Sequence, residues 1–319
     1  MTTELRPQRL LSVGSIVADI RIDVPHLPPR GGDVLGSTAS VSAGGGFNVL
    51  AAAARNGLAC AFAGRHGIGP YGIRIRADLA REGIPALLEP SPEGDSGFCV
   101  VMVEPHGERT FITSPGVESE LGPRTLASLA LEASDAVFVS GYDLCYPALG
   151  PAIAQWTQTL PVGLGLVVDP GPMVGEIPSD ILCAVLANAR VLTMNRREAM
   201  LFGAAEDLGQ IAVRVLARLA AGALVIVRDG ANGCVLASAG LLDSPVRIPA
   251  PPVRMIDSTG AGDAHTGVFV AAMAAGLDPV SAAHRANWAA AVSVTRRGPA
   301  TAPTTEELET FLAAAHCCT

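Results

Sequence analysis

The stretch Asp257-Ser-Thr-Gly-Ala-Gly-Asp263 places glycines and a carboxylate within seven residues. The apolar segment 253–256 before it predicts a short strand, and the Ala- and Val-rich segment 264–276 after it predicts a helix. The glycines are therefore expected in a strand-to-helix turn. Backbone N–H groups in the first turn of a helix lack intrahelical partners, and the helix dipole makes that end positive. The pattern indicates an anion site.

Small residues in this turn leave room for an anion to reach the backbone amides. Gly260, Ala261 and Gly262 carry almost no side-chain bulk, and Asp263 enters the first helical turn directly after them. A carboxylate placed beside a bound anion has a clear use when it takes a proton from an attacking hydroxyl. The arrangement therefore indicates phosphoryl transfer to an alcohol, with Asp263 as the proton acceptor.

Other glycine motifs are less consistent with this chain. A dinucleotide-binding G-x-G-x-x-G fails because His265 stands at the third glycine position. A P-loop fails because the chain has no lysine, all 22 basic residues being arginine. Any phosphate must then be bound by backbone amides, arginine or a metal ion. An ordinary Gly-rich turn capped by an aspartate remains the alternative for the motif taken alone.

Composition limits the class of protein. The 319 residues suit a single α/β domain with a small accessory lobe, and the formal net charge of −8 disfavours nucleic-acid and membrane partners. The run 10–18 imitates a signal peptide, but charged residues follow at once, so a buried strand and a cytoplasmic protein are expected. The seven cysteines are scattered and odd in number, which indicates free thiols, and no role is predicted for Cys317 and Cys318.

Apolar strands and helical stretches alternate along most of the chain, which predicts a mainly parallel sheet with helices on both faces. The exceptions are two β-rich segments, at about 20–42 and 97–114, the second with a hairpin turn at Pro105-His106-Gly107. We expect these segments to pair as a small lid on a single domain spanning 1–319. Predicted strands cover 10–17, 60–63, 136–140, 165–169, 191–193 and 223–228, and predicted helices cover 48–56, 73–82, 126–133, 180–187 and 208–220.

Two separated motifs together resemble the ribokinase-like (PfkB) family of carbohydrate and nucleoside kinases. One is Ala43-Gly-Gly-Gly-Phe-Asn48 with the Ala-rich helix after it, and the other is Asp257–Asp263. The hairpin and the Ser140-Gly-Tyr142 strand end look like an uncharacterised bacterial sugar-kinase branch. Supporting matches lie at Gly14–Asp19, Asn195–Glu198, Arg228–Gly233 and Asn287–Gly298.

The resemblance implies a ribokinase-like fold and an ATP- and Mg²⁺-dependent kinase acting on a primary hydroxyl of a small sugar. Asp263 would be the general base, and the amides of Gly260, Ala261 and Gly262 would stabilise the transferring phosphoryl group. A homodimer formed through the lid is a further expectation from the family.

The resemblance also implies the ligands of the sugar. They are Asp19, Gly44, Gly45 and Asn48, with Phe98 of the lid as a possible cover. A carboxylate can accept hydrogen bonds from two sugar hydroxyls, and glycines let a ring lie against the backbone. The alternatives are structural: Asp19 as a cap at a strand end, Asn48 as a helix N-cap, and Phe98 as a core residue.

For the nucleotide, the family pattern N-x-x-E falls on Asn195 and Glu198, the latter expected to organise Mg²⁺ through water. The alternative is an ordinary exposed helix start. Further positions match those that line the nucleotide groove in the family, although a tight turn after a strand would also explain the glycines. They are Arg228, Gly230, Gly233 and Asn287.

A monovalent-cation site beside the anion turn is also implied, and we expect K⁺ to support turnover. Backbone carbonyls and a side-chain oxygen would form the cage, which would fix the turn before phosphate arrives. The alternative is a helix C-terminus with its usual basic residues and glycine. The matching positions are Asp257, Thr259, Ser293, Arg296 and Gly298.

Departures from the family pattern leave the acceptor open. Val17 stands where ribokinases usually carry Asn, and Met173 stands where some members carry Arg. A nucleoside kinase acting on the ribose 5′-hydroxyl is therefore an alternative. A non-catalytic sugar sensor is the alternative from another class, although the retained Asp263 and its glycine turn argue against it.

Overall fold

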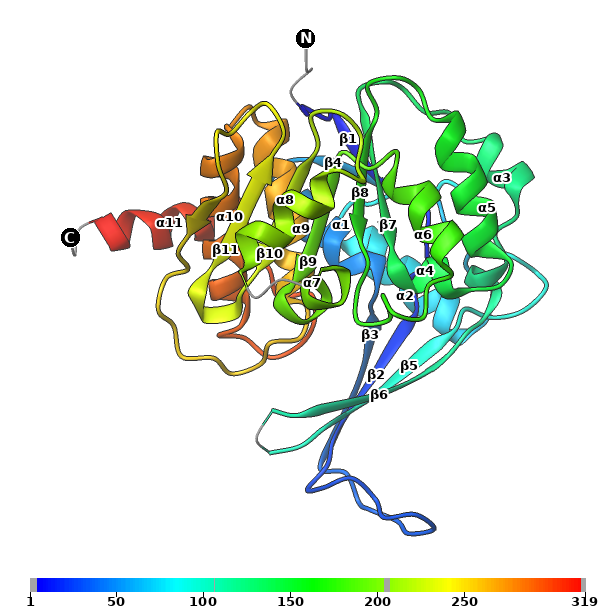
Figure 1. Ribbon diagram of the computed structural model, residues 1–319. Helices are drawn as coiled ribbons and strands as arrows, with labels where there is room; N and C mark the ends of the chain where they lie inside the picture. The colour runs from blue at the N-terminus through cyan, green and yellow to red at the C-terminus, as the bar shows by residue number, and fades with distance from the viewer. Residues whose placement is uncertain (1–4, 106, 204–206, 317–319) are drawn as a thin grey trace.

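A long sheet runs through the body of the molecule, and a smaller sheet projects from it (Figure 1). The computed structural model describes residues 5–105, 107–203 and 207–316. His106 of the predicted hairpin turn and Cys317 and Cys318 lie outside the described residues. In the described part of the chain, every helix is too short or too polar to cross a membrane.

The body sheet is mainly parallel, as the alternating pattern predicts. Its strand order is β12-β11-β10-β9-β8-β7-β1-β4, and within this sheet only β11 is reversed, pairing antiparallel with both β10 and β12. The central strands are buried on both faces by Val, Leu, Ile and Ala side chains. The strands are β1 (Arg9–Ser12), β4 (Ala59–Phe62), β7 (Asp135–Ser140), β8 (Gly165–Asp169), β9 (Val191–Asn195), β10 (Leu224–Arg228), β11 (Cys234–Ser238) and β12 (Val246–Ile248).

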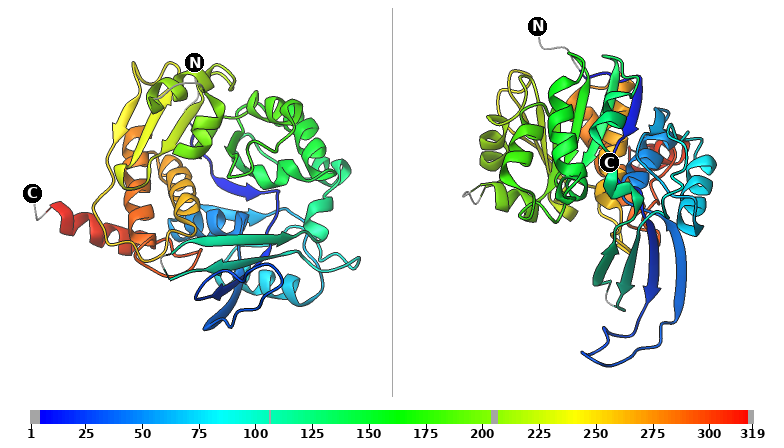
Figure 2. Two further views of the ribbon diagram at one scale, coloured as in Figure 1. Left: turned by 60° about the horizontal axis from the view of Figure 1, so that its bottom comes forward. Right: turned by 90° about the vertical axis from the view of Figure 1, so that its right-hand side faces the viewer.

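Helices cover both faces of the body sheet, each with its own apolar core (Figure 2). One face carries α3 (Pro123–Ala127), α4 (Gly141–Cys145), α5 (Leu149–Trp156), α6 (Ser179–Leu186), α7 (Arg196–Phe202) and α8 (Leu208–Leu216). The other carries α1 (Gly46–Arg55), α2 (Pro70–Arg81), α9 (Ala261–Ala274) and α10 (Pro279–Ser293), and α11 (Thr305–His316) packs on α10. Three short 3₁₀ turns lie at Val117–Glu120, Thr157–Thr159 and Gly230–Asn232.

The projecting sheet is the predicted lid. Its order is β3-β2-β5-β6, so the two segments that the sequence sets apart do pair with each other, β2 and β5 lying parallel. Figure 2 shows the lid extending away from the helices. The strands are β2 (Ala18–Asp23), β3 (Thr38–Ala43), β5 (Phe98–Val103) and β6 (Arg109–Ser114).

One predicted strand is wrong, and two further predicted elements are shorter than expected. The segment 253–256 is not a strand: Val253, Met255 and Ile256 are exposed, and the segment pairs with no strand in the described chain, so a loop leads into α9. The predicted strand 10–17 ends at Ser12. The predicted helix 126–133 ends at Ala127, where a turn begins.

The contact between α1 and α9 positions the candidate base. Gly267 of α9 faces α1 so closely that a Cβ there would lie 2.4 Å from the carbonyl oxygen of Val49. Glycine therefore permits the two helices to touch along their backbones. Because both helices begin at the same edge of the body, the first turn of α1 meets the first turn of α9.

Candidate active site

Asn48 and Asp263 meet where α1 and α9 begin. The Asn48 Nδ2 donates a hydrogen bond to Asp263 Oδ2 at 2.9 Å. Helix α1 has its N-cap at Gly45, so Asn48 lies inside the helix and the N-cap interpretation of Asn48 is wrong. The Asn48 Oδ1 is buried and has no hydrogen-bond partner within the described residues. An orphaned acceptor beside a carboxylate is the expected state of a site that receives a polar ligand.

Burial shifts the pKa values of two carboxyl groups, that of Asp263 at the start of α9 and that of Asp19 on the neighbouring lid strand. Burial raises the pKa of Asp263 to about 6, with Asp169 adding to the rise, while Asn48 and Arg228 oppose it. Burial also raises the pKa of Asp19 to about 7, and the charge of Asp263 contributes. Asp19 and Asp263 are therefore close enough for the charge of Asp263 to raise the pKa of Asp19. Asp19 belongs to β2 of the lid, so its interpretation as a cap at the end of the first strand is wrong.

The glycine turn and Arg228 form a positively charged corner before α9. Gly260 is the N-cap of α9 in a left-handed conformation, with φ of 73°. A Cβ on Gly262 would lie 2.1 Å from Arg228 Nη1, so only glycine lets the guanidinium reach the turn. The Arg228 Nε is buried without a hydrogen-bond partner in the described part of the chain. Helix amides and a guanidinium thus share one corner, as an anion site requires.

Two further carboxylates hold Arg228 in place. Its Nη2 donates to Asp169 Oδ2 at 2.9 Å and lies 3.7 Å from Glu198 Oε2. Glu198 forms a capping box with Asn195: the Asn195 amide donates to Glu198 Oε2 at 2.7 Å, and Asn195 Oδ1 accepts from the Glu198 amide at 2.9 Å. Burial and the charge of Asp169 raise the pKa of Glu198. The buried carboxyl groups of Asp169 and Glu198 and the partly buried one of Asp263 therefore surround one guanidinium.

The remaining nucleotide candidates lie at a turn after β10. Gly230 and Gly233 have positive φ, 57° and 88°, and a Cβ on Gly233 would lie 2.0 Å from the carbonyl oxygen of Ile248. Asn287 donates to that same oxygen at 2.9 Å. Gly233 and Asn287 thus fix the chain after β12. The structure does not bring these two to Asp263, whereas it does bring Arg228 close to it.

Comparison with known proteins identifies the family of this chain. The family model described as "pfkB family carbohydrate kinase" matches residues 7–306. The chain belongs to the pfkB family of carbohydrate kinases. It is therefore a phosphotransferase that transfers phosphate to an alcohol group of a sugar, with ATP as donor.

Relatives of this carbohydrate kinase share its whole length. The chain is 34% identical to the uncharacterized sugar kinase YegV of Escherichia coli, covering 94% of this chain and 93% of that one. It is 28% identical to a ribokinase of Bacillus subtilis, covering 94% and 98%. The structure of Arabidopsis thaliana ribokinase complexed with ribose and ATP superposes with a TM-score of 0.75 at 22% identity, covering 96% and 99%. The fold is ribokinase-like.

Strand register identifies the lid residues that share a face with Asp19. In this kinase Asp19 pairs with Cys99, and Arg21 pairs with Val101, which pairs in turn with Phe111. Cross-strand partners point to the same side of a sheet, and neighbours along a strand point to opposite sides. Phe98 therefore lies on the other face, where its ring is 5.2 Å from that of Tyr71. The structure does not bring Phe98 to the site.

Two site residues that sequence reasoning missed are aromatic. Phe111 on the inner lid face is half exposed. Tyr142 begins α4 after the cap Ser140, and burial raises its pKa to about 12, with Cys99, Asp263 and Asp19 contributing. The signal for Tyr142 was its place directly after a parallel strand, where ligands collect in α/β folds. Phe111 gave no local signal, because only register places it with Asp19.

The residues expected to cage K⁺ do come together, but they have other partners. Asp257 Oδ1 accepts hydrogen bonds from the Thr259 amide at 2.9 Å and from Thr259 Oγ1 at 2.6 Å, and Oδ2 accepts from the Gly298 amide at 3.1 Å. Among the backbone carbonyls, Ser293 O accepts a hydrogen bond from Thr301 Oγ1 at 3.1 Å, and Gly298 O accepts one from the same hydroxyl at 3.4 Å. Arg296 forms an ion pair with Glu307 at 2.8 Å.

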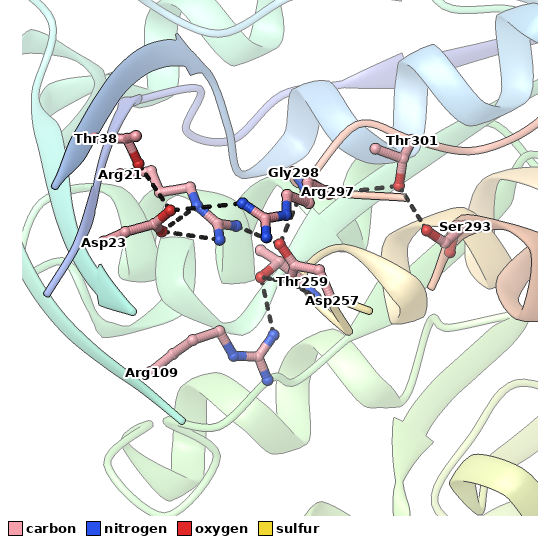
Figure 3. A network of polar contacts seen from close by, with 10 residues as sticks. All are labelled: Arg21, Asp23, Thr38, Arg109, Asp257, Thr259, Ser293, Arg297, Gly298 and Thr301. Carbon is pink, nitrogen blue, oxygen red and sulfur yellow. Dashed lines mark hydrogen bonds and ion pairs between the residues drawn. The ribbon is translucent and has the colours of Figure 1, made fainter. Parts of the chain in front are cut away.

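The carboxylate of Asp257 also has a cationic partner from the lid. Arg21 Nη1 contacts Asp257 Oδ2, and Arg109 Nη1 donates to Thr259 Oγ1 at 2.9 Å (Figure 3). Burial alone would raise the pKa of Asp257, but the hydrogen bonds from Thr259, Gly298 and Arg21 hold it below its usual range. The loop before the anion turn is thus joined to the lid.

Proposed function

We propose that this carbohydrate kinase is ATP- and Mg²⁺-dependent and phosphorylates a primary hydroxyl of a monosaccharide-sized acceptor. The observation that carries the proposal is the group of Asp19, Asn48 and Asp263 beside the glycine turn. It combines a partly buried base, an unsatisfied acceptor atom, and a corner where backbone amides of the helix meet the Arg228 guanidinium.

Asp263 acts as the general base. A pKa of about 6 leaves it ionised at neutral pH while keeping it a better proton acceptor than an exposed aspartate. The hydrogen bond from Asn48 fixes which oxygen remains available, because Oδ2 is already occupied. In a loose phosphoryl-transfer transition state the attacking oxygen changes little until late, so a moderate base is sufficient.

The sugar binds between α1 and the lid. Asp19 accepts hydrogen bonds from sugar hydroxyls, and Asn48 Oδ1, which lacks a partner among the described residues, accepts one more. Gly44 is part of the same wall, because a Cβ there would lie 2.1 Å from Asp19 Oδ2. With Gly45 it lets the sugar approach the backbone. We assign Cys99, Phe111 and Tyr142, rather than Phe98, to the cover of the sugar.

Phosphate binds at the corner formed by Gly260, Ala261, Gly262 and Arg228. Backbone amides and the guanidinium are positioned before the reaction, so they stabilise the charge of the transferring group without reorganisation. The carboxyl groups of Asp169, Glu198 and Asp263 outnumber the guanidinium, and this excess of negative charge fits a divalent cation that arrives with the nucleotide. When bound, Mg²⁺ neutralises phosphate charge, with Glu198 and Asn195 orienting its waters.

For the nucleotide base, Gly230 is the remaining candidate at the surface of the turn, where a Cβ would meet no other atom within 4 Å. Gly233 and Asn287 shape the groove indirectly by holding the carbonyl of Ile248. K⁺ does not enter the mechanism, because the expected cage residues do not fit it: their carboxylate is neutralised by Arg21.

We also propose that the lid pairs with the lid of a second copy. Its outer face carries Ile20, Met102 and the exposed side chains of Val41 and Ile112. Contiguous apolar surface of this kind is typical of interfaces. Light scattering of the purified protein and of Ile112→Glu tests it: a dimer that becomes a monomer supports the proposal, and a monomeric parent contradicts it.

Acceptor screening tests the activity. ADP formation is measured with a panel of pentoses, hexoses, sugar phosphates and nucleosides, each with the parent protein and with Asp263→Asn. We expect a monosaccharide or its phosphate to stimulate ADP formation in the parent alone. Faster ADP formation with a nucleoside than with any sugar would indicate a nucleoside kinase. Binding of a sugar without ADP formation would favour the sensor function.

A further inference from the structure

Arg21 is a cation that the chain itself supplies to a buried carboxylate. It lies on β2 and contacts Asp257, whose side chain is 5% exposed, while also binding Asp23 at 3.0 Å. Asp257 immediately precedes the anion turn, and a buried carboxylate needs a compensating positive charge. Here that charge comes from a strand far away in sequence.

The contact belongs to a chain of interactions that crosses the lid (Figure 3). Thr38 Oγ1 of β3 donates to Asp23 Oδ2 at 2.8 Å, and Asp23 binds Arg21. On the far side, Arg109 of β6 donates to Thr259 Oγ1, which itself donates to Asp257. Three lid strands are therefore joined to the loop that presents the phosphate-binding amides.

Charge balance at this place opposes a second cation. The guanidinium groups of Arg21, Arg109 and Arg297 face two carboxylates, Asp23 and Asp257, with Arg297 lying 3.9 Å from Asp23. Both oxygens of Asp257 already accept hydrogen bonds. A K⁺ ion would have to displace Arg21 or remain beside it, and like charges at such distances repel strongly.

We infer that the Arg21 guanidinium takes the place of a monovalent cation, so that this kinase works without K⁺ and the lid itself orders the anion turn. The inference rests on the proposed function for its activity readout only. Arg21 is a positioning residue: it acts through Asp257 and does not touch the reacting groups.

This arrangement links acceptor binding to the phosphate site. Asp19 and Arg21 are two residues apart on β2, so they lie on the same face and move together with the lid. When Asp19 contacts the sugar, Arg21 is brought to Asp257. A free K⁺ ion would provide the charge without this dependence on the lid.

The experiment removes the Arg21 guanidinium by substitution and tests whether K⁺ in solution can replace its charge. Turnover and melting temperature are measured for the parent, Arg21→Ala and Arg21→Lys in KCl and in tetramethylammonium chloride at equal ionic strength. The parent and Arg21→Lys should respond equally to the two salts. Arg21→Ala should lose turnover roughly tenfold in the organic salt and regain about threefold or more in KCl, because K⁺ can now reach the carboxylate.

Melting temperature separates this inference from the proposed function, because it requires no acceptor. KCl should raise the melting temperature of Arg21→Ala above its value in the organic salt, and Arg21→Ala/Asp257→Asn should lose that rise. Arg30→Ala, an exposed arginine of the same lid, is the matched control and should behave as the parent does. K⁺ activation of the parent, or an Arg21→Ala variant with no K⁺ response in either measurement, would overturn the inference.

Discussion

The body sheet and the lid sheet are held in place by different forces. Strand β8 is buried along its full length, and its apolar residues contact helices on both faces. Strand β3 is exposed over most of its length, and the lid meets the catalytic loop through Arg21 and Arg109. Packing therefore fixes the base and the phosphate corner in the body, whereas charged side chains place the lid. Substitutions in the body site should therefore reduce kcat, whereas substitutions in the lid should change the acceptor KM and the response to monovalent cations.

The strongest test of the body side is Asp263→Asn. The substitution keeps the shape of the side chain but removes the proton acceptor, so kcat should fall by roughly 10²–10⁴. Nucleotide affinity, measured by calorimetry, and melting temperature should remain close to those of the parent. Near-normal turnover in a folded variant would falsify the assignment of the base.

A second change to the body is Arg228→Gln. It leaves Asp169 and Glu198 without their partner, and breaking a buried ion pair costs about 3–5 kcal/mol of stability. It also removes a group that lowers the pKa of Asp263, so the acid limb of the activity profile should move to higher pH. Thermal melting and a pH–rate profile measure the two effects. If the acid limb of the pH–rate profile does not move, Arg228 does not lower the pKa of Asp263.

On the lid side, Asp19→Ala should mainly raise the acceptor KM. Loss of a hydrogen-bonding partner typically costs about 1–3 kcal/mol, or roughly 10–100-fold. Steady-state kinetics at saturating ATP measures KM and kcat separately, and Val100→Ala, on the paired strand but on the other face of the lid, is a matched control for lid packing. If Asp19→Ala lowers the melting temperature without changing acceptor affinity, its role is structural.

The two raised pKa values predict a pH dependence that both regions share. Burial raises the pKa of Asp263 to about 6 and that of Asp19 to about 7, so kcat/KM should fall as pH decreases through this window. The free energy of unfolding should depend on pH in the opposite direction to kcat/KM. Because the folded protein holds protons that the unfolded chain has released, stability decreases as pH rises from about 4 to 7.

Asp19→Asn is the discriminating variant for this pair of effects. In this variant the melting temperature should depend less on pH. The part of the decrease in kcat/KM at low pH that comes from acceptor binding should also disappear. An activity limb near pH 4 in the parent would contradict the raised values.

Local patterns predicted the parts of the site that lie at the starts of helices. The glycine turn before α9, Asp263 in its first turn, and the pairing of 20–42 with 97–114 as a lid are all present. These features depend on residue size, backbone conformation and apolar periodicity, which a sequence displays directly. Segment 253–256 has the same apolar character, yet it is an exposed loop, because a strand needs a partner that sequence does not reveal.

Residues whose role depends on register or long-range charge could not be predicted. Phe98 and Cys99 are adjacent, and only the pairing of β5 with β2 decides which of them faces Asp19. The contact of Arg21 with Asp257 joins segments that share no local pattern. Sequence reasoning predicted K⁺ beside Asp257 and did not anticipate that a guanidinium of the lid contacts the same carboxylate.

The parallel pairing of β2 with β5 has a consequence for how the chain folds. Between these strands the chain forms α1, β4 and α2, all of which pack on the body. The pairing of β2 with β5 therefore closes a long loop that contains these elements, and β6 joins the sheet after β5 in the chain. During synthesis, β2 and β3 are made before their parallel neighbour β5, and Asp257 is made later still. Non-local contacts of this kind form slowly. The lid strands are therefore made before most of the body sheet, whereas their charged partner Asp257 is made long after β6.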